Sequence, residues 1–269
     1  MDQVIEDSVE ASAGEETQVR KLDAAEEARI KSLMELGAFY GLSKSRTNPK
    51  MKPNIITSKS GVEVIDLEKT ISALDKATEA LRNKIKNGGS VLFVGTTPSA
   101  KVAVKTIAEE LRMPYVTERW LGGTLTNFRV ISQRISQLKK IKEDKETGNL
   151  EKYTKKERTQ ILKELEKMDK FFHGLFYMER MPSVMVVFDL RNNTLAASEA
   201  KKVGIMSIAT VNTNANPDLV DYSVPINDKA LSVIDYLANE FSKAIKEGQK
   251  EYESSAAAKA EDNKIKTNG

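Results

Sequence analysis

Apolar positions in residues 66–116 and 184–246 alternate between short continuous runs and helically spaced series. Continuous runs are typical of strands buried on both faces of a parallel sheet, and helical series repeat every three or four residues. The expected strands are Val91–Val94, Met113–Val116, Val184–Phe188, Ile205–Val211 and Tyr222–Val224, and the expected helices are one capped by Asp66 and running to Lys86, Ser99–Arg112, Leu195–Val203 and Ala230–Lys246. Strands and helices that alternate in this order predict an α/β fold with a doubly wound parallel sheet.

The residues before this region carry weaker signals. Residues 1–28 are acidic and poor in large apolar side chains, which predicts an N-terminal extension that is disordered or loosely helical. Helical spacing begins at Ile30, and the basic, proline-containing segment Gly37–Pro53 is typical of an extended loop. Ile55–Thr57 and Val62–Asp66 flank a Ser-Gly pair and are expected to form a short hairpin.

The middle of the chain follows another pattern. Ile131, Ile135 and Leu138 recur at spacings of four and three, and Thr154 and Glu157 match a capping box that starts a second helix with a stripe of its own. Two amphipathic helices joined by a short turn predict a projecting hairpin of coiled-coil type, suited to contact and not to chemistry. The chain thus divides into an acidic N-terminal extension (1–28), an α/β domain (29–127 and 174–247), a coiled-coil hairpin insertion (128–173) and a polar C-terminal tail (248–269).

Composition removes several classes of function. The chain has no cysteine and one histidine, which excludes disulfides, thiolate nucleophiles, Cys-based zinc sites and His–His metal pairs. No apolar run approaches the ~18 residues that span a bilayer. The acidic N-terminus also lacks the apolar segment of a secretory signal. These features fit a cytoplasmic protein without Cys-based or His–His metal sites. We also expect no cofactor, no metal and no small-molecule substrate, since no catalytic group or cofactor motif stands out in the sequence.

Charge is unevenly distributed, although the net charge is only +3. Five basic residues and no acidic residue lie from Lys44 to Lys59, and thirteen basic against eight acidic residues lie from Arg129 to Lys170. Such asymmetry indicates an anionic partner for particular patches, while any one patch taken alone is better explained as a solvated face.

Two loops occupy the position where α/β sheets usually bind ligands, at the carboxyl ends of strands. Gly95–Ser99 lacks both the lysine–serine pair of a phosphate-binding loop and the G-x-G-x-x-G pattern, and Asn212–Asp218 consists of ordinary turn formers. Asp189 has no His or Cys beside it to build a triad, and His173 is expected in a loop. No catalytic group of residues emerges. An α/β nucleotide-binding protein or enzyme that uses these two loops stays the alternative.

Arg119–Asn127 is the most unusual stretch, because it holds the only tryptophan and two adjacent glycines directly before the hairpin. In a structural interpretation, Trp120 is buried and anchors the root of the hairpin, while Gly122 and Gly123 let backbone segments cross. In a functional interpretation, Arg119 pairs with a phosphate and the glycines permit close approach. One loop can do both.

A series of short motifs follows one order along the chain: Asn48–Pro53, Ile65–Thr70, Phe93–Thr96, Arg119–Asn127, Thr154–Glu157, Thr213-Asn214 with Pro217, and Asn227-Asp228 with Ala230. Together they resemble the bacterial small-subunit ribosomal protein S2 family over about Lys31 to Ile245. The resemblance implies a Rossmann-like domain with an inserted coiled-coil hairpin, no enzymatic activity, and a place on the solvent side of the small ribosomal subunit. Phe39 and Leu42 stand where the family's G-x-H-x-G-H segment has histidines, so no metal or imidazole role is carried over.

We therefore predict a structural constituent of the small ribosomal subunit that binds ribosomal RNA phosphates and neighbouring ribosomal proteins. Phosphate contacts would position the protein, and the shape of the folded RNA would provide specificity. A further possibility makes the hairpin a protein-docking arm whose RNA contacts are incidental. The side chains expected to contact RNA are Lys44, Arg46, Lys50, Lys52, Arg119, Arg129, Lys139, Lys140, Lys155 and Lys156.

Overall fold

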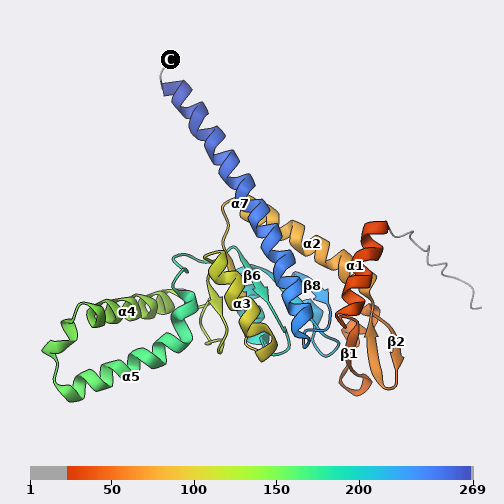
Figure 1. Cartoon of the computed structure of the whole chain (residues 1–269), viewed down its shortest axis with the longest axis horizontal. Coiled ribbons are helices and arrows are strands. Elements are labelled where there is room, and N and C mark those ends of the chain that lie inside the picture. Colours follow the sequence, from red (N-terminus) through yellow and green to blue (C-terminus); the bar gives the residue numbers. More distant parts are fainter. Residues whose placement is uncertain (1–22, 268–269) are drawn as a thin grey trace, which may run out of the picture.

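The computed structural model describes residues 23–267, and a five-stranded parallel sheet forms its centre (Figure 1). Of the five strands in this sheet, β4 comes first along the chain, and it lies inside the sheet and not at its edge. The chain therefore adds later strands on both sides of β4. This order confirms the predicted doubly wound α/β fold. The strands, in spatial order, are β5 Tyr115–Val116, β4 Val91–Val94, β6 Val184–Val187, β7 Met206–Val211 and β8 Tyr222–Pro225.

Helices cover both faces of this sheet, which explains the continuous apolar runs. Val91 and Phe93 of β4 pack in one core layer with α2, α3 and α7, while Leu92 and Val94 pack in the other with α6 and the roots of α4 and α5. Successive side chains of a strand point to opposite faces of the sheet, and both faces are buried here, so every position of the strand needs an apolar residue. The helices are α1 Ala24–Glu35, α2 Leu67–Lys86, α3 Pro98–Glu110, α4 Phe128–Glu146, α5 Lys155–Phe172, α6 Thr194–Val203 and α7 Leu231–Thr267.

Side-chain caps fix the starts of two helices at the predicted residues. The carboxylate of Asp66 accepts hydrogen bonds from the backbone N–H of Glu68 and Lys69 at 3.1 and 3.3 Å. At α5, the backbone N–H of Thr154 donates to Glu157 at 2.9 Å, and the N–H of Glu157 donates back to the Thr154 hydroxyl at 3.4 Å. Both arrangements satisfy amides that have no partner inside the helix.

A second, antiparallel sheet precedes α2, with the order β1-β3-β2. Its strands β2 Ile55–Lys59 and β3 Val62–Ile65 form the predicted hairpin. The expectation of one extended loop over Gly37–Pro53 is wrong, since this segment contains β1 Tyr40–Ser43 and the short 3₁₀ helices η2 Lys44–Arg46 and η3 Pro49–Asn54. β1 is an edge strand that pairs with β3 through its backbone, so its side chains carry little periodic signal.

The first helix starts earlier than its apolar spacing suggests. α1 begins at Ala24 and not at Ile30, because Asp23 and Glu26 form a capping box in which the Asp23 N–H donates to the Glu26 carboxylate at 3.3 Å. Arg29 then ties α1 to α2 through two hydrogen bonds to Asp75, at 2.8 and 3.1 Å. The last residues of the predicted acidic extension are therefore helical, and its residues 1–22 lie outside the described part of the chain.

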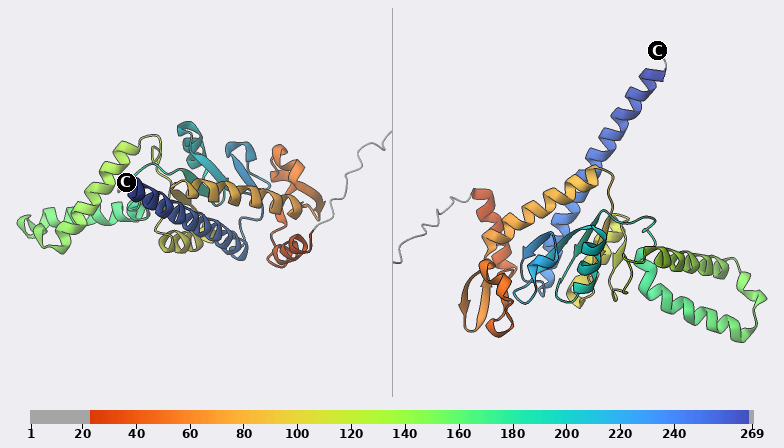
Figure 2. Two further views of the ribbon diagram at one scale, coloured as in Figure 1. Left: turned by 90° about the horizontal axis from the view of Figure 1, so that it is seen from above. Right: turned by 180° about the vertical axis from the view of Figure 1, so that it is seen from behind.

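The last helix ends later than predicted. α7 does not stop at Lys246 but continues to Thr267, through most of the segment interpreted as a polar tail (Figures 1 and 2). Its middle crosses α2 closely at Gly248, where a Cβ atom would come within 2.8 Å of the Arg82 carbonyl oxygen. Ion pairs from Glu251 to Arg82 and Lys86 hold the same crossing. Glycine thus serves helix–helix contact here and does not end the helix.

The predicted hairpin is present as α4 and α5, joined by a turn that includes the 3₁₀ helix η4 Asn149–Lys152. Lys142, near the end of α4, forms an ion pair of 2.5 Å with Asp169, near the end of α5. Helices aligned along their whole length would separate these two ends, so α4 crosses α5 at an angle (Figure 2, left). A continuous coiled-coil seam stays a prediction. Within residues 23–267, no helix has the length and apolar character to cross a membrane.

Candidate nucleic-acid interface

One buried carboxylate organises residues 119–127, here called the root loop, which leads from β5 into α4. Glu199 of α6 is 4% exposed, and the backbone N–H groups of Gly123, Leu125 and Thr126 donate to it at 2.8, 3.0 and 3.2 Å. The Thr126 hydroxyl donates to the same carboxylate at 3.2 Å. Charge-assisted hydrogen bonds of this kind are stronger than neutral ones, so the loop is held rigidly.

The tryptophan of the root loop takes part in this arrangement. Trp120 is buried, as an anchor would be, and its indole N–H donates to Glu199 at 3.2 Å. Gly123 has φ +92°, a backbone conformation that a side chain disfavours, whereas Gly122 is exposed and has room for one. Burial raises the pKa of Glu199, but the hydrogen bonds from the loop outweigh burial and keep the pKa below its ordinary value.

Two exposed arginines lie at the start of the root loop and just after its end. Arg119 and Arg129 are both exposed, at the start of the root loop and in the first turn of α4. Within the described residues, neither has an ion-pair partner. Their guanidinium groups therefore keep the planar set of donors that binds phosphate oxygens in pairs.

A second basic group lies on η2 and η3, here called the basic loop and formed by Lys44, Arg46, Lys50 and Lys52, all exposed. Thr213 fixes this loop to the carboxyl end of β7: the Asn48 N–H donates to its carbonyl at 2.8 Å, and the Leu42 N–H donates to its hydroxyl at 2.9 Å. Among these four residues, Lys50 is the one that forms an ion pair within the described part of the chain, with Asp218. A phosphate that binds Lys50 would therefore have to compete with this carboxylate.

The four lysines predicted on the hairpin are also exposed, and they form two pairs on different helices. Lys139 and Lys140 belong to α4, and the Lys139 ammonium lies 5.9 Å from the centre of the Phe176 ring. Lys155 and Lys156 occupy the first turn of α5, where the positive end of the helix dipole disfavours cations. The presence of these two lysines is therefore not explained by a contribution to the stability of α5.

The predicted RNA-contacting residues form two groups and not one site. The basic loop lies beside the small sheet at one end of the body, and the hairpin with its root loop extends from the other end (Figure 1). Any single polyanion that touches both must span the body.

The two loops considered for a nucleotide are closed by internal contacts. Gly95 packs against α3, where a Cβ atom would come within 2.7 Å of the Val104 side chain, and the Thr96 hydroxyl donates to Asn193 at 3.0 Å. In the second loop, the Asn212 amide donates to the Asp228 carboxylate at 3.1 Å. The Thr96 hydroxyl and the Asn212 amide are thus engaged in internal contacts.

Behind these loops lies an ionic cluster that the sequence did not reveal. Asp189 and Asp228 are 0% and 1% exposed, and the Lys229 ammonium lies 2.5 Å from the first carboxylate and 3.7 Å from the second. Burial, together with the charge of Asp189, raises the pKa of Asp228 to about 6. Burial lowers the pKa of Lys229, but the two carboxylates outweigh burial and raise it. Lys229, whose side chain is 44% exposed, therefore acts as a counter-ion to both carboxylates just before α7.

Glu199 and Lys229 are the main residues missed by sequence reasoning. A signal for Glu199 existed, because it lies three residues after Ala196 and one before Ala200, on the small apolar face of α6. An acidic residue on the buried face of a helix needs donors from elsewhere. His173, by contrast, lies where expected, in the short 3₁₀ helix η5 His173–Leu175 after the hairpin.

Comparison with known proteins adds independent findings. A family model described as Ribosomal protein S2 matches residues 33–248. A curated relative, the small ribosomal subunit protein uS2 of Coprothermobacter proteolyticus, is 41% identical over 220 residues, which cover 82% of this chain and 82% of the relative. The matched range contains the basic loop, the root loop and both hairpin helices.

Proposed function

The chain belongs to the ribosomal protein S2 family, and from this premise we propose that it holds ribosomal RNA, next to neighbouring ribosomal proteins of the cytoplasmic small subunit, through the basic side chains at both ends of its body. It is a structural component of the small ribosomal subunit and not an enzyme. The alternative of a nucleotide-binding protein or enzyme is not favoured, because the chain belongs to a ribosomal protein family, and Thr96 and Asn212 of the two candidate loops already bond inside the protein.

The basic loop carries the proposal. It presents four exposed cations on backbone that Thr213 holds in place, with no acidic residue from Lys44 to Lys59. Fixed cations lose less conformational freedom when they meet a phosphate than cations on a mobile segment. The exposed Arg119 and Arg129 on the rigid root loop and α4 supply a second set of the same kind.

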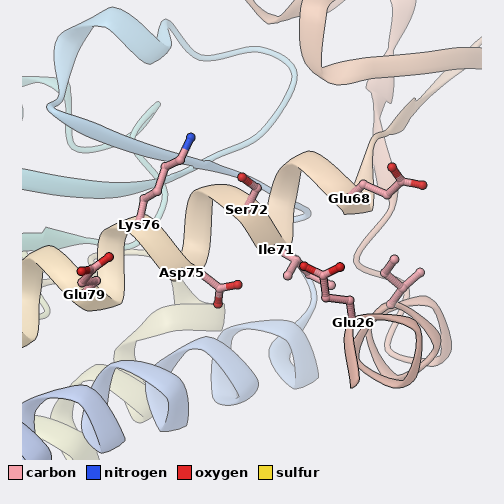
Figure 3. Close-up of a pocket in the computed structure, with 8 residues that line it drawn as sticks. Glu26, Glu68, Ile71, Ser72, Asp75, Lys76 and Glu79 are labelled. Atoms are coloured by element: carbon pink, nitrogen blue, oxygen red, sulfur yellow. The ribbon is translucent and has the colours of Figure 1, made fainter. Parts of the chain in front are cut away.

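An acidic surface shows where RNA is not expected. A groove between α1 and α2 is lined by the side chains of Glu26, Glu68, Asp75 and Glu79 (Figure 3). The ammonium of Lys76 points away from these carboxylates, and Arg29 forms an ion pair with Asp75. Carboxylates repel phosphates, so RNA contacts are expected at the two ends of the body and not along this groove. Exposed lysines on α1 and α2 can therefore serve as controls.

The proposal predicts a specific salt response. Each phosphate neutralised changes the slope of log affinity against log salt by about −0.9 for a duplex. The double variant Lys50→Ala with Lys52→Ala is therefore expected to flatten the slope for small-subunit RNA by about one to two. Filter binding at several salt concentrations measures it.

The matched control is Lys31→Ala with Lys84→Ala, which removes the same charge from exposed positions on α1 and α2. The control should leave the slope unchanged. Equal slopes for both double variants would show that the basic loop contributes only net charge, and a flat salt response of the unmodified protein would reject the RNA contact itself.

A further inference from the structure

A pocket of about 510 Å³ lies at the base of the hairpin, and no residue of the basic loop or of the root loop lines it. Elements far apart in sequence build it: the end of α3, strand β5, the second half of α4 and the turn that begins with η5. It is lined by Glu109, Arg112, Tyr115, Lys139, His173, Phe176, Tyr177 and Glu179.

Aromatic rings and cations meet in this pocket. The rings of His173 and Phe176 have their centres 5.3 Å apart, and the ammonium groups of Lys142 and Lys139 lie 4.6 and 5.9 Å from the centre of Phe176. Tyr177 is 51% exposed, so much of its ring faces solvent. The pocket therefore combines an exposed ring, that of Tyr177, with the cations Lys139 and Arg112 among the side chains that line it.

The pocket is preorganised by contacts below it. Gly174 lets the backbone of η5 lie directly on Tyr115, where any Cβ atom would overlap the Tyr115 carbonyl oxygen and ring. The Tyr115 hydroxyl in turn donates to Glu109 at 2.9 Å. Asp169 pairs with Lys142 at 2.5 Å and with His173 at 3.4 Å, which fixes α4 against the turn. Little needs to move for a planar group to enter.

We propose that this pocket takes an unpaired base of ribosomal RNA, stacked on Tyr177, while Lys139 and Arg112 neutralise the phosphates beside that base. The inference deepens the proposed RNA contact and rests on it. Stacking on aromatic rings next to cations is how proteins hold single-stranded nucleotides. Glu109 and Glu179 line the same pocket, which disfavours a phosphate inside it and favours a base edge with an amino group, since carboxylates accept such hydrogen bonds.

The test uses the full chain and single-stranded RNA decamers of cytidine, of uridine and of abasic sugar-phosphate. Tyr177→Leu is expected to weaken binding of the cytidine decamer about tenfold, a typical loss for one stacked base, and to leave the abasic decamer unaffected. Tyr177→Phe keeps the ring and should bind like the unmodified protein. Cytidine should bind more tightly than uridine, and Glu179→Gln should reduce that preference.

A second readout does not depend on loss of affinity. Tyr177→Trp places a fluorophore in the pocket, and stacking should quench its emission with cytidine but not with abasic decamers, while the parental protein, whose Trp120 is buried, reports the background. Equal binding of Tyr177→Leu and Tyr177→Phe, or equal quenching by both decamers, would overturn the pocket assignment. Binding of small-subunit RNA, measured in parallel, tests the proposed function separately, because the basic loop supports it without Tyr177.

Discussion

Glu199→Ala is expected to be among the most destabilising single substitutions in the chain, although Glu199 is a charged residue. Removing the carboxylate leaves the N–H groups of Gly123, Leu125 and Thr126 and the Trp120 indole without their acceptor inside the protein. One buried unsatisfied donor costs about 1–3 kcal/mol, and water entry limits the sum, so we expect a loss of about 3–5 kcal/mol. Urea unfolding at neutral pH measures it.

Two further variants make this prediction specific. Glu199→Gln keeps the size but turns one acceptor into a donor, so about half of the loss is expected. Glu79→Ala removes an exposed helical glutamate and should change the free energy of unfolding by less than about 0.5 kcal/mol. If Glu199→Ala behaved like Glu79→Ala, the root loop would not depend on this carboxylate.

Acid should weaken the same contact. The folded protein keeps the pKa of Glu199 below its ordinary value of about 4.5. A lowered pKa gives stability that is present above the unfolded value and is lost as the pH falls through the folded value. The difference in unfolding free energy between the unmodified protein and Glu199→Gln should therefore be constant from pH 8 to about 5 and shrink in more acidic buffer.

The sequence predicts the central sheet well because burial on both faces leaves a local mark. Val91–Val94 and Val184–Val187 are apolar throughout, and Asp66 and Thr154 cap their helices through neighbours two or three residues away. All of this information lies within a few residues. Local physics also explains why the hairpin helices were predicted from their apolar stripes.

Features that depend on distant parts of the chain were not predictable. β1 exists because its backbone pairs with β3, and α7 passes Gly248 because that glycine meets α2. The candidate site shows the same division: exposed lysines could be chosen from charge runs, but the partners of Glu199 lie more than seventy residues away. Nor could charge runs show that Asp218 already pairs with Lys50.

Lys229→Met is the second substitution with a large expected effect. It leaves Asp189 and Asp228 buried side by side without the ammonium that separates their charges. Breaking a fully buried ion pair by removing one partner costs about 3–5 kcal/mol, because an uncompensated charge stays behind. The Lys229 side chain is 44% exposed and solvent screens its charge, so we expect a smaller loss of about 2–3 kcal/mol. As a control, Lys243→Met removes an exposed pair with Glu240 and should cost less than about 1 kcal/mol.

The pH dependence distinguishes this ionic cluster from a simple packing defect. The pKa of Asp228, about 6, lies above its ordinary value of 3.8, so its contribution to stability is fully present below about pH 4 and is lost as the pH rises through 6. Removing Lys229 raises the pKa of Asp228 further. The loss of unfolding free energy in Lys229→Met should therefore be smaller at pH 5 than at pH 8.

Thermal unfolding at both pH values, for Lys229→Met and for Lys229→Met combined with Asp228→Asn, completes the test. The added Asn should recover much of the loss at pH 8, and a penalty that is the same at both pH values and in both backgrounds would show that Lys229 contributes packing and not charge.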